Sequence, residues 1–280
     1  MSGKVLPRLC VFFIGVPLIL GLVMLPQYNH LAILLLITAI SFIAATELFH
    51  IFSHNFVLKN KWLIVTLTTL IPLTFVFRAF FQFDFKYITY AYIFVILLFL
   101  IWEVFSNTTF ENSNAQIVSS ITIFTYAGLL FTFISRMAFL QNSTIVLILF
   151  LTMVFFCDSF AWFFGVLFGK NNKGFIKASP NKSIAGFFGG FLGSICSGSL
   201  AFLLKREIFE GSFFKMLLLA VITAFCAIIG DLVESILKRS SNCKDSGSVI
   251  PGRGGILDSI DSLIFAAPVF YFLITHLYQF

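Results

Sequence analysis

Acidic and basic side chains gather in the last third of a chain that is otherwise strongly apolar. Five of its 12 acidic residues lie in one short stretch: Asp231, Glu234, Asp245, Asp258 and Asp261. The same stretch holds four basic residues: Lys238, Arg239, Lys244 and Arg253. A charged group at membrane depth is costly unless it is paired or hydrated, so a cluster of this kind indicates a functional site.

The spacing of these residues places them on two helical faces. Four polar residues of GDLVESILKR stand at i, i+3, i+4 and i+7 and so share one face: Asp231, Glu234, Ser235 and Lys238. The next apolar run begins with ILDSIDS, where Asp258, Asp261 and Ser262 stand at i, i+3 and i+4. We therefore expect two polar stripes to meet inside a helix bundle, joined by a loop that carries Asp245.

The residue types indicate the chemistry. Carboxylate clusters bind hard divalent cations, and Mg²⁺ in particular takes a few carboxylates together with substrate phosphates. Lysine and arginine suit phosphate oxygens, and the glycines of PGRGG would let backbone N–H groups approach an anion. Salt bridging between helices needs only two charges, whereas this stretch carries nine. The pattern favours metal-assisted phosphoryl or nucleotidyl transfer at the cytoplasmic face of a membrane.

The elements that must position these groups are membrane helices. Of the 280 residues, 59% are hydrophobic and only 11% are charged, which excludes an ordinary soluble domain. Apolar runs predict an all-α polytopic membrane protein with about nine transmembrane helices, near residues 9–25, 31–52, 62–81, 87–105, 115–135, 144–168, 184–204, 212–234 and 256–278. No hydrophilic stretch is long enough for a second domain, so we predict one transmembrane catalytic domain, 1–280, with its motif region at 235–261.

Charge bias predicts the orientation. With a cytoplasmic N-terminus, twelve of the 18 lysines and arginines fall on the cytoplasmic side, including those of loops 169–183 and 238–255. Glu47, Glu103 and Arg136 lie near predicted span ends, and we expect each to reach the membrane interface. The cysteines and histidines show no spacing typical of a zinc site.

The stretch SILKRSSNCKDSGSVIPGRGGILDSID, residues 235–261, resembles the signature of the phosphatidate cytidylyltransferases of bacterial type, also called CDP-diacylglycerol synthases. The pattern is S-x-x-K-R, four residues, K-D-x-G, then P-x-H-G-G-x-x-D-R-x-D. The matching residues are Ser235, Lys238, Arg239, Lys244, Asp245, Gly247, Pro251, Gly254, Gly255, Asp258 and Asp261. A looser match to D-[ST]-x-A-Y-x-x-G, F-G-K and S-P-x-K-T-W-E-G precedes it, at Asp158, Ser159, Ala161, Gly165, Phe168, Gly169, Lys170, Ser179, Pro180, Lys182, Ser183 and Gly186.

The chain departs from these patterns at a few positions. Arg253 stands in place of the signature histidine, and Ser259 in place of the arginine between the last two aspartates. In the earlier motifs Trp162 replaces a tyrosine, and Ile184 with Ala185 replaces the W-E pair. These changes leave open a weakened enzyme or an altered lipid preference.

The resemblance implies cytidylyl transfer from CTP to phosphatidic acid, giving CDP-diacylglycerol and pyrophosphate in phospholipid biosynthesis. It implies Mg²⁺, a homodimer, contact with membrane lipids, no nucleic acid, and a multi-pass location in the cell inner (plasma) membrane. We expect Mg²⁺ ligands at Asp231, Asp245, Asp258 and Asp261, with Glu234 close by. The expected catalytic residues are Lys244, Asp245, Asp258 and Asp261, and the expected substrate-binding residues are Asp158, Ser179, Lys182, Ser235, Lys238, Arg239 and Arg253.

Two other functions stay open on the residues alone. Another Mg²⁺-dependent membrane enzyme acting on a polyprenyl or lipid phosphate, such as a polyprenol kinase or a prenyltransferase, would also use acidic clusters. It should show D-x-x-x-D motifs at two separate helix ends, whereas this chain has D-x-x-D once. A cation transporter would place acids near mid-bilayer in corresponding halves of the chain, whereas here they crowd toward one end.

Overall fold

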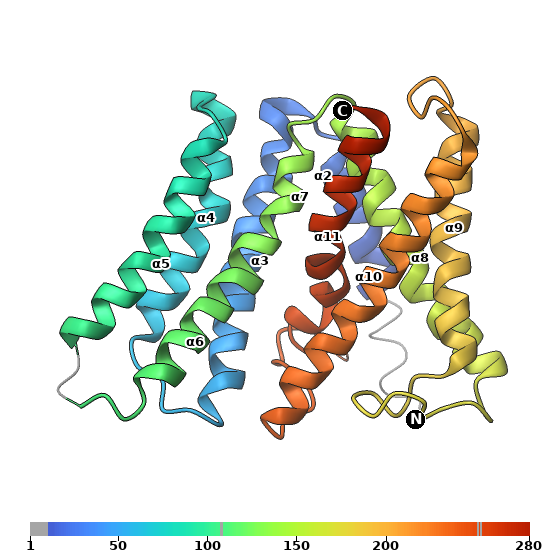
Figure 1. Cartoon of the computed structure of the whole chain (residues 1–280). Helices are drawn as coiled ribbons and strands as arrows, with labels where there is room; N and C mark the ends of the chain where they lie inside the picture. The colour runs from blue at the N-terminus through green and yellow to red at the C-terminus, as the bar shows by residue number, and fades with distance from the viewer. Residues whose placement is uncertain (1–10, 107–108, 251, 253) are drawn as a thin grey trace. The chain divides into compact units, whose positions relative to one another are not determined.

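The computed structural model describes residues 11–106, 109–250, 252 and 254–280, and this part of the chain is almost wholly helical (Figure 1). In it the only β-pairing is two isolated bridges. The all-α prediction is therefore confirmed. The helical elements are η2 (Val11–Gly15, π-helical), α2 (Val16–Val23), α3 (Gln27–Ser53), α4 (Lys61–Phe81), α5 (Lys86–Ser106), α6 (Ser113–Ile123), η3 (Phe124–Leu130, π-helical), α7 (Thr132–Met137), α8 (Ser143–Phe168), α9 (Ile184–Leu204), α10 (Phe213–Ser240) and α11 (Leu257–Tyr278).

Eight helices of the described residues are long and apolar enough to cross a membrane, with α6, η3 and α7 counted as the single helix Ser113–Met137. They coincide with eight of the predicted spans. The largest difference is at α10, which continues to Ser240 instead of ending at 234. At the position of the first predicted span, 9–25, the structure has the shorter apolar helix Phe13–Val23. The chain is a multi-pass membrane protein.

Helices dominate because a backbone in hydrocarbon must satisfy its own hydrogen bonds. Many span hydroxyls follow the same rule, since they donate to a carbonyl one turn earlier on their own helix. Examples are Thr38 to Leu34, Thr68 to Ile64, Thr69 to Val65 and Thr223 to Leu219. These groups are therefore satisfied inside their helices.

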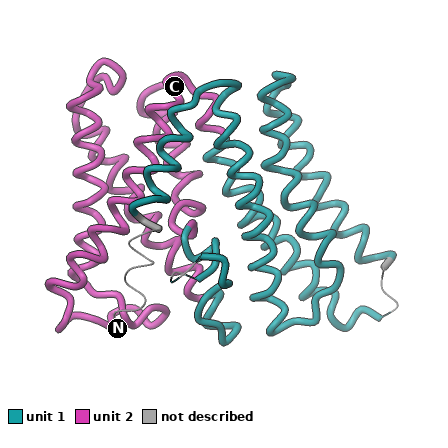
Figure 2. The backbone as a smooth tube through the Cα atoms, turned by 180° about the vertical axis from the view of Figure 1, so that it is seen from behind, with its two compact units in different colours: residues 1–135, 237–259 teal, residues 136–236, 260–280 magenta. Residues whose placement is uncertain are grey.

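The chain forms two compact units, each built from two separate stretches (Figure 2). Unit 1 comprises Met1–Ser135 and Leu237–Ser259, and unit 2 comprises Arg136–Ile236 and Ile260–Phe280. Helices α10 and α11 contribute to both units. Whether the whole chain acts as a single catalytic domain stays a prediction.

In unit 1, α3 packs along α4, and both contact the π-helical segment η3. The Ser41 hydroxyl on α3 donates to the Ala127 carbonyl in η3 at 2.7 Å. A Cβ at Gly128 would lie 3.1 Å from the Thr68 carbonyl oxygen of α4, so a glycine suits this close approach. The expectation that Glu47 and Glu103 reach the interface is wrong, because their exposed fractions are only 5% and 6%. Each packs inside unit 1 instead.

In unit 2, α8 and α9 pack side by side along a seam of small residues. A Cβ at Gly189 would lie 2.8 Å from the Phe160 carbonyl oxygen, so only a glycine fits there without a shift. Ser194 on α9 donates to the Ala220 carbonyl of α10 at 2.9 Å. The rings of Phe150 on α8 and Phe270 on α11 lie 5.0 Å apart. These contacts hold the parts of α10 and α11 that belong to unit 2 against α8 and α9.

Candidate active site

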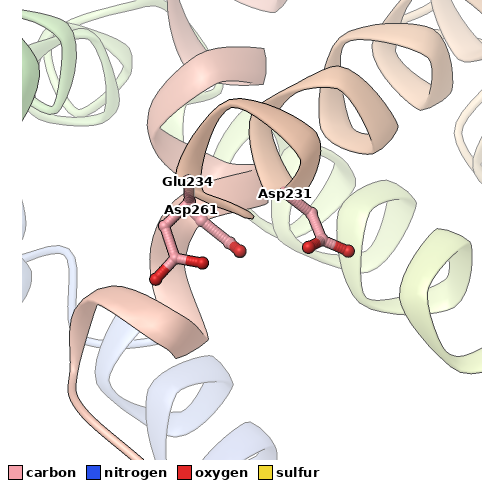
Figure 3. Close-up of side chains that lie close together, drawn as sticks. All are labelled: Asp231, Glu234 and Asp261. Atoms are coloured by element: carbon pink, nitrogen blue, oxygen red, sulfur yellow. The ribbon is translucent and has the colours of Figure 1, made fainter. Parts of the chain in front are cut away.

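Three carboxylates from two helices form a compact cluster in unit 2 (Figure 3). Asp231 and Glu234 come from α10 and Asp261 comes from α11. One carboxylate oxygen from each residue lies within 4.8 Å of the other two. Glu234 is fully buried, Asp261 is 7% exposed, and Asp231 is half-buried. The prediction that the two polar stripes meet is confirmed for these three residues, which we call the acidic cluster.

Gly230 explains why the two helices come so close. A Cβ at this position would lie 2.6 Å from the Asp261 carbonyl oxygen and 2.7 Å from the Phe265 Cβ. Any larger residue would therefore push α10 away from α11. The missing side chain lets the backbones touch directly beside Asp231.

Lys182 brings a positive charge to the edge of the cluster. Its Nζ lies 2.6 Å from an Asp231 carboxylate oxygen. Lys182 is held in a turn in which its own N–H donates to the Ser179 carbonyl at 3.0 Å, and the next residue, Ser183, caps α9 through the Gly186 N–H at 3.1 Å. Lys182 thus places one positive charge directly against Asp231.

Asp158 is linked to the acidic cluster through Ser262. The Ser262 N–H donates to Asp261 Oδ1 at 2.6 Å, and the Ser262 hydroxyl donates to Asp158 Oδ1 at 3.3 Å. The predicted site residues Asp158, Lys182, Asp231 and Asp261 therefore lie together in unit 2. They come from α8, the 169–183 loop, α10 and α11.

The donor set of the acidic cluster fits a hard divalent cation. Carboxylate oxygens are the ligands that Mg²⁺ prefers, and the three in this cluster lie close enough together to share one ion. Buried like charges at this spacing repel strongly unless a cation or protons neutralise them. Asp231, Glu234 and Asp261 are the residues that would hold Mg²⁺.

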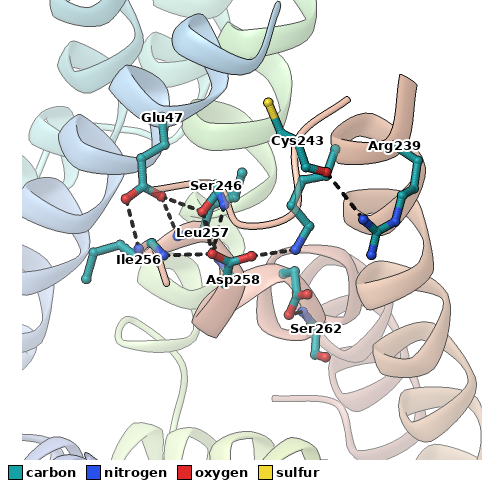
Figure 4. A network of polar contacts seen from close by, with 11 residues as sticks. Glu47, Arg239, Cys243, Ser246, Ile256, Leu257, Asp258 and Ser262 are labelled. Atoms are coloured by element: carbon teal, nitrogen blue, oxygen red, sulfur yellow. Dashed lines mark hydrogen bonds and ion pairs between the residues drawn. The ribbon is translucent and has the colours of Figure 1, made fainter. Parts of the chain in front are cut away.

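Asp258 lies in unit 1 and is already engaged by protein donors (Figure 4). Its Oδ1 pairs with the Lys238 ammonium group. Its Oδ2 accepts from the Ser246 N–H and hydroxyl, each at 2.9 Å, and from the Gly255 N–H at 2.7 Å. The structure thus joins the predicted residues Asp258 and Lys238 to each other. The role of Asp258 as a metal ligand stays a prediction.

A turn before α11 shapes this second group. Gly254 has a φ of +113°, a region that favours glycine, and its N–H pairs with the Ile250 carbonyl at 3.1 Å. A Cβ at Gly254 would also collide with the Asp258 carboxylate. Gly254 therefore allows the turn to form and leaves room for the Asp258 carboxylate.

The side chains of the remaining predicted residues take no part in the ion pairs and carboxylate hydrogen bonds described above. Lys244, Asp245 and Arg239 are exposed, Ser235 is buried on α10, and Ser179 is half-buried. The Arg239 guanidinium donates to the Cys243 carbonyl at 3.5 Å. Arg253 falls outside the described residues. The assigned roles of these six residues remain predictions.

Two glutamates lie beside these groups of charged residues. Glu234 is predicted to lie close to the Mg²⁺ ligands, and the structure places one of its carboxylate oxygens within 4.8 Å of those of Asp231 and Asp261. The Glu47 carboxylate accepts hydrogen bonds from the Ile256 and Leu257 N–H groups next to Asp258 (Figure 4). No spacing rule could connect it to residues some 200 positions later.

The model of the Cytidylyltransferase family matches residues 6–277. The chain is similar to curated phosphatidate cytidylyltransferases of several bacteria. It is 33% identical to that of Bacillus subtilis over 183 residues (65% of this chain, 66% of the relative) and 36% identical to that of Thermotoga maritima over 185 residues (62% and 66%). It is 39% identical to one of Staphylococcus epidermidis over 123 residues (44% and 46%). The matched regions thus span two thirds or less of these relatives. The resemblance seen in the signature is confirmed, and the chain belongs to the cytidylyltransferase family.

Proposed function

We propose that this protein transfers the cytidylyl group of CTP to phosphatidic acid, giving CDP-diacylglycerol and pyrophosphate with the help of Mg²⁺. The observation that carries this proposal is the acidic cluster with Lys182 beside it. Family membership and the names of the curated relatives support the choice of substrates.

The reaction suits a site without a strong general base. The nucleophile is an oxygen of the phosphate monoester of phosphatidic acid, whose second pKa is about 6, so it is largely ionised at neutral pH. This oxygen forms a bond to the α-phosphorus of CTP, and the bond from that phosphorus to the bridging oxygen breaks. Pyrophosphate leaves with the electron pair. The protein must hold two polyanions together and stabilise the charge that develops between them.

The residues divide this work by charge. Asp231, Glu234 and Asp261 would hold the cation, which when bound neutralises phosphate charge. The cationic residues would bind and orient phosphate oxygens: Lys182, Lys238, Arg239, Lys244 and Arg253. Asp158, Ser179 and Ser235 would assist in binding substrate. Asp245 and Asp258 remain proposed ligands or electrostatic partners at the start of α11.

We also propose that the enzyme works in the cell inner (plasma) membrane with its charged loops toward cytosolic CTP. The bias of lysine and arginine supports this orientation, and bacterial relatives support the location. A homodimer is proposed on the family resemblance alone, and the mass of the purified protein–detergent particle tests it.

The test is a transfer assay with purified protein, CTP labelled in its α-phosphate, and phosphatidic acid in mixed micelles. Labelled liponucleotide should form only when both substrates and Mg²⁺ are present, and a chelator should stop it. Asp261→Asn should be inactive, whereas Asp84→Asn, at an exposed acid between α4 and α5, should match the unaltered protein. No labelled lipid product from folded, unaltered protein would exclude this function. Transfer to a polyprenyl phosphate instead would favour the alternative enzyme class.

A further inference from the structure

Glu47 of α3 is a buried carboxylate whose hydrogen bonds all go to the segment before and at the start of α11. Its Oε1 accepts from the Ile256 N–H at 2.9 Å. Its Oε2 accepts from the Leu257 N–H at 2.8 Å and lies 3.0 Å from the Ser246 hydroxyl oxygen, whose single proton it shares with Asp258 Oδ2 (Figure 4). We call the described residues of 241–256, between α10 and α11, the signature loop. Glu47 thus ties α3 to the end of this loop.

These bonds are located where a helix most needs them. The first N–H groups of a helix have no partner within the helix, and the positive end of its dipole favours an anion. Leu257 is the first residue of α11, and Ile256 precedes it. Glu47 therefore acts as a cap for α11 supplied by another helix. Because Asp258 lies in the same first turn of α11, the cap also fixes the position of the Asp258 backbone.

The other side of the signature loop is tied to α3 as well. The Asn55 side-chain amide, just past the end of α3, donates to the Ser240 carbonyl at 2.8 Å and to the Ser241 hydroxyl at 3.2 Å. Ser240 ends α10. Glu47 and Asn55 hold the two flanks of the signature loop from one helix end.

Two glycines of the family signature leave space for the Glu47 carboxylate. A Cβ at Gly247 would lie 2.6 Å from Glu47 Oε1 and 3.0 Å from its Cδ, and its three nearest atoms all belong to Glu47. A Cβ at Gly255 would lie 2.6 Å from Glu47 Cδ. Gly247 has no positive φ, so an alanine there meets no backbone strain. The space it leaves is filled by Glu47.

We propose that Glu47 is a positioning residue for cytidylyl transfer, which holds the signature loop and the first turn of α11 in the geometry that Asp258 and Lys238 require. This inference rests on the proposed function. It also explains why residue 247 is a glycine: the space beside its Cα holds the Glu47 carboxylate, and a substrate phosphate does not need it.

The first experiment compares Glu47→Gln with Glu103→Gln. Glutamine keeps the size of the side chain but has only one acceptor oxygen. Its NH₂ group would therefore face the Ile256 or the Leu257 N–H, and two donors cannot form a hydrogen bond with each other. We expect faster amide hydrogen exchange in peptides covering 246–257, and a kcat lowered about tenfold or more at equal folded protein. Glu103 is an equally buried glutamate on α5 of the same unit, so its variant controls for the loss of a buried carboxylate and should alter neither quantity.

The second experiment is a double-mutant cycle between Glu47→Ala and Gly247→Ala. Alone, Gly247→Ala should lower kcat/KM, because its methyl group collides with Glu47. In the Glu47→Ala background the same change should cost little or restore part of the activity, since the colliding atoms are gone. If a substrate phosphate needs the space at Gly247, the alanine will be equally harmful in both backgrounds.

The outcomes separate this inference from the proposed function. Unchanged kcat per folded Glu47→Gln protein, or unchanged exchange in 246–257, would overturn the positioning role. An additive cycle would overturn the task assigned to Gly247. Absence of cytidylyl transfer in the unaltered protein would remove the proposed function and the catalytic role with it, while the exchange comparison would still show whether Glu47 holds the loop.

Discussion

Gly230 of α10 lies against the backbone of Asp261 of α11 so closely that an added Cβ would be 2.6 Å from the Asp261 carbonyl oxygen. This contact brings the carboxylates of the acidic cluster together. We therefore predict that Gly230→Ala separates the helices and lowers kcat/KM by an order of magnitude or more, with a stability cost of about 1–3 kcal/mol. Gly21→Ala on α2, where a Cβ would meet nothing within 4 Å, is the matched control. Equal activity in the two variants would show that the close contact is unimportant.

The acidic cluster should be more stable without one of its charges when no metal is present. Glu234→Gln keeps the side-chain size and removes like-charge repulsion, so in chelator the midpoint of thermal unfolding should rise. Mg²⁺ should stabilise the unaltered protein by binding the folded state and should stabilise this variant less. Unfolding scans at several Mg²⁺ concentrations test both effects. A Mg²⁺ response that is the same in both proteins would argue against a metal site at Glu234.

Asp258 should behave in the opposite way. Its carboxylate pairs with Lys238 and accepts three further hydrogen bonds, so Asp258→Asn removes a negative charge that directly contacts a buried ammonium group. We expect a loss of about 3 kcal/mol in stability, seen as a lower unfolding midpoint with or without Mg²⁺. Adding Lys238→Met should recover part of that loss. An increase in stability for Asp258→Asn would place this residue with the acidic cluster instead.

Lys182 should matter for substrate binding far more than for stability. Its ion pair with Asp231 is partly exposed, with side-chain exposures of 25% and 39%, and pairs of this kind contribute about 1 kcal/mol or less. Lys182→Gln should therefore leave the unfolding midpoint nearly unchanged while raising the KM for CTP or phosphatidic acid. Lys205→Gln, at an exposed lysine after α9, is the control. A KM that stays normal would remove Lys182 from the binding site.

The orientation predicts a difference in thiol labelling between the two ends of α10. Cys243 follows α10 and should resist a membrane-impermeant reagent in intact cells, then react once the membrane is opened. A cysteine introduced by Ser212→Cys, just before α10, should react in intact cells, because this helix has 28 residues and so extends about 42 Å. Both measurements use a chain whose other cysteines are replaced by alanine. The reverse pattern would invert the topology and remove the site from cytosolic CTP.

Features encoded in contiguous residues could be predicted from the sequence. Eight spans can be predicted because a backbone in hydrocarbon must satisfy its own hydrogen bonds, which a helix does. The length of an apolar run is therefore enough to identify each span. The family could be recognised because its signature is continuous from Ser235 to Asp261. The helical period also placed Asp231 and Glu234 on one face of α10.

The tertiary structure decided which faces meet. Periodicity shows the polar side of a helix but not the helix opposite, so only packing at Gly230 could group Asp231 and Glu234 with Asp261. Asp258 and Asp261 look equivalent in the sequence, yet Asp258 is held by Lys238 and loop donors, whereas Asp261 joins the acidic cluster. Glu47 reaches the Ile256 N–H across 209 positions of the chain. Such a contact depends on how separate helices pack, so it cannot be predicted from a local pattern of residues.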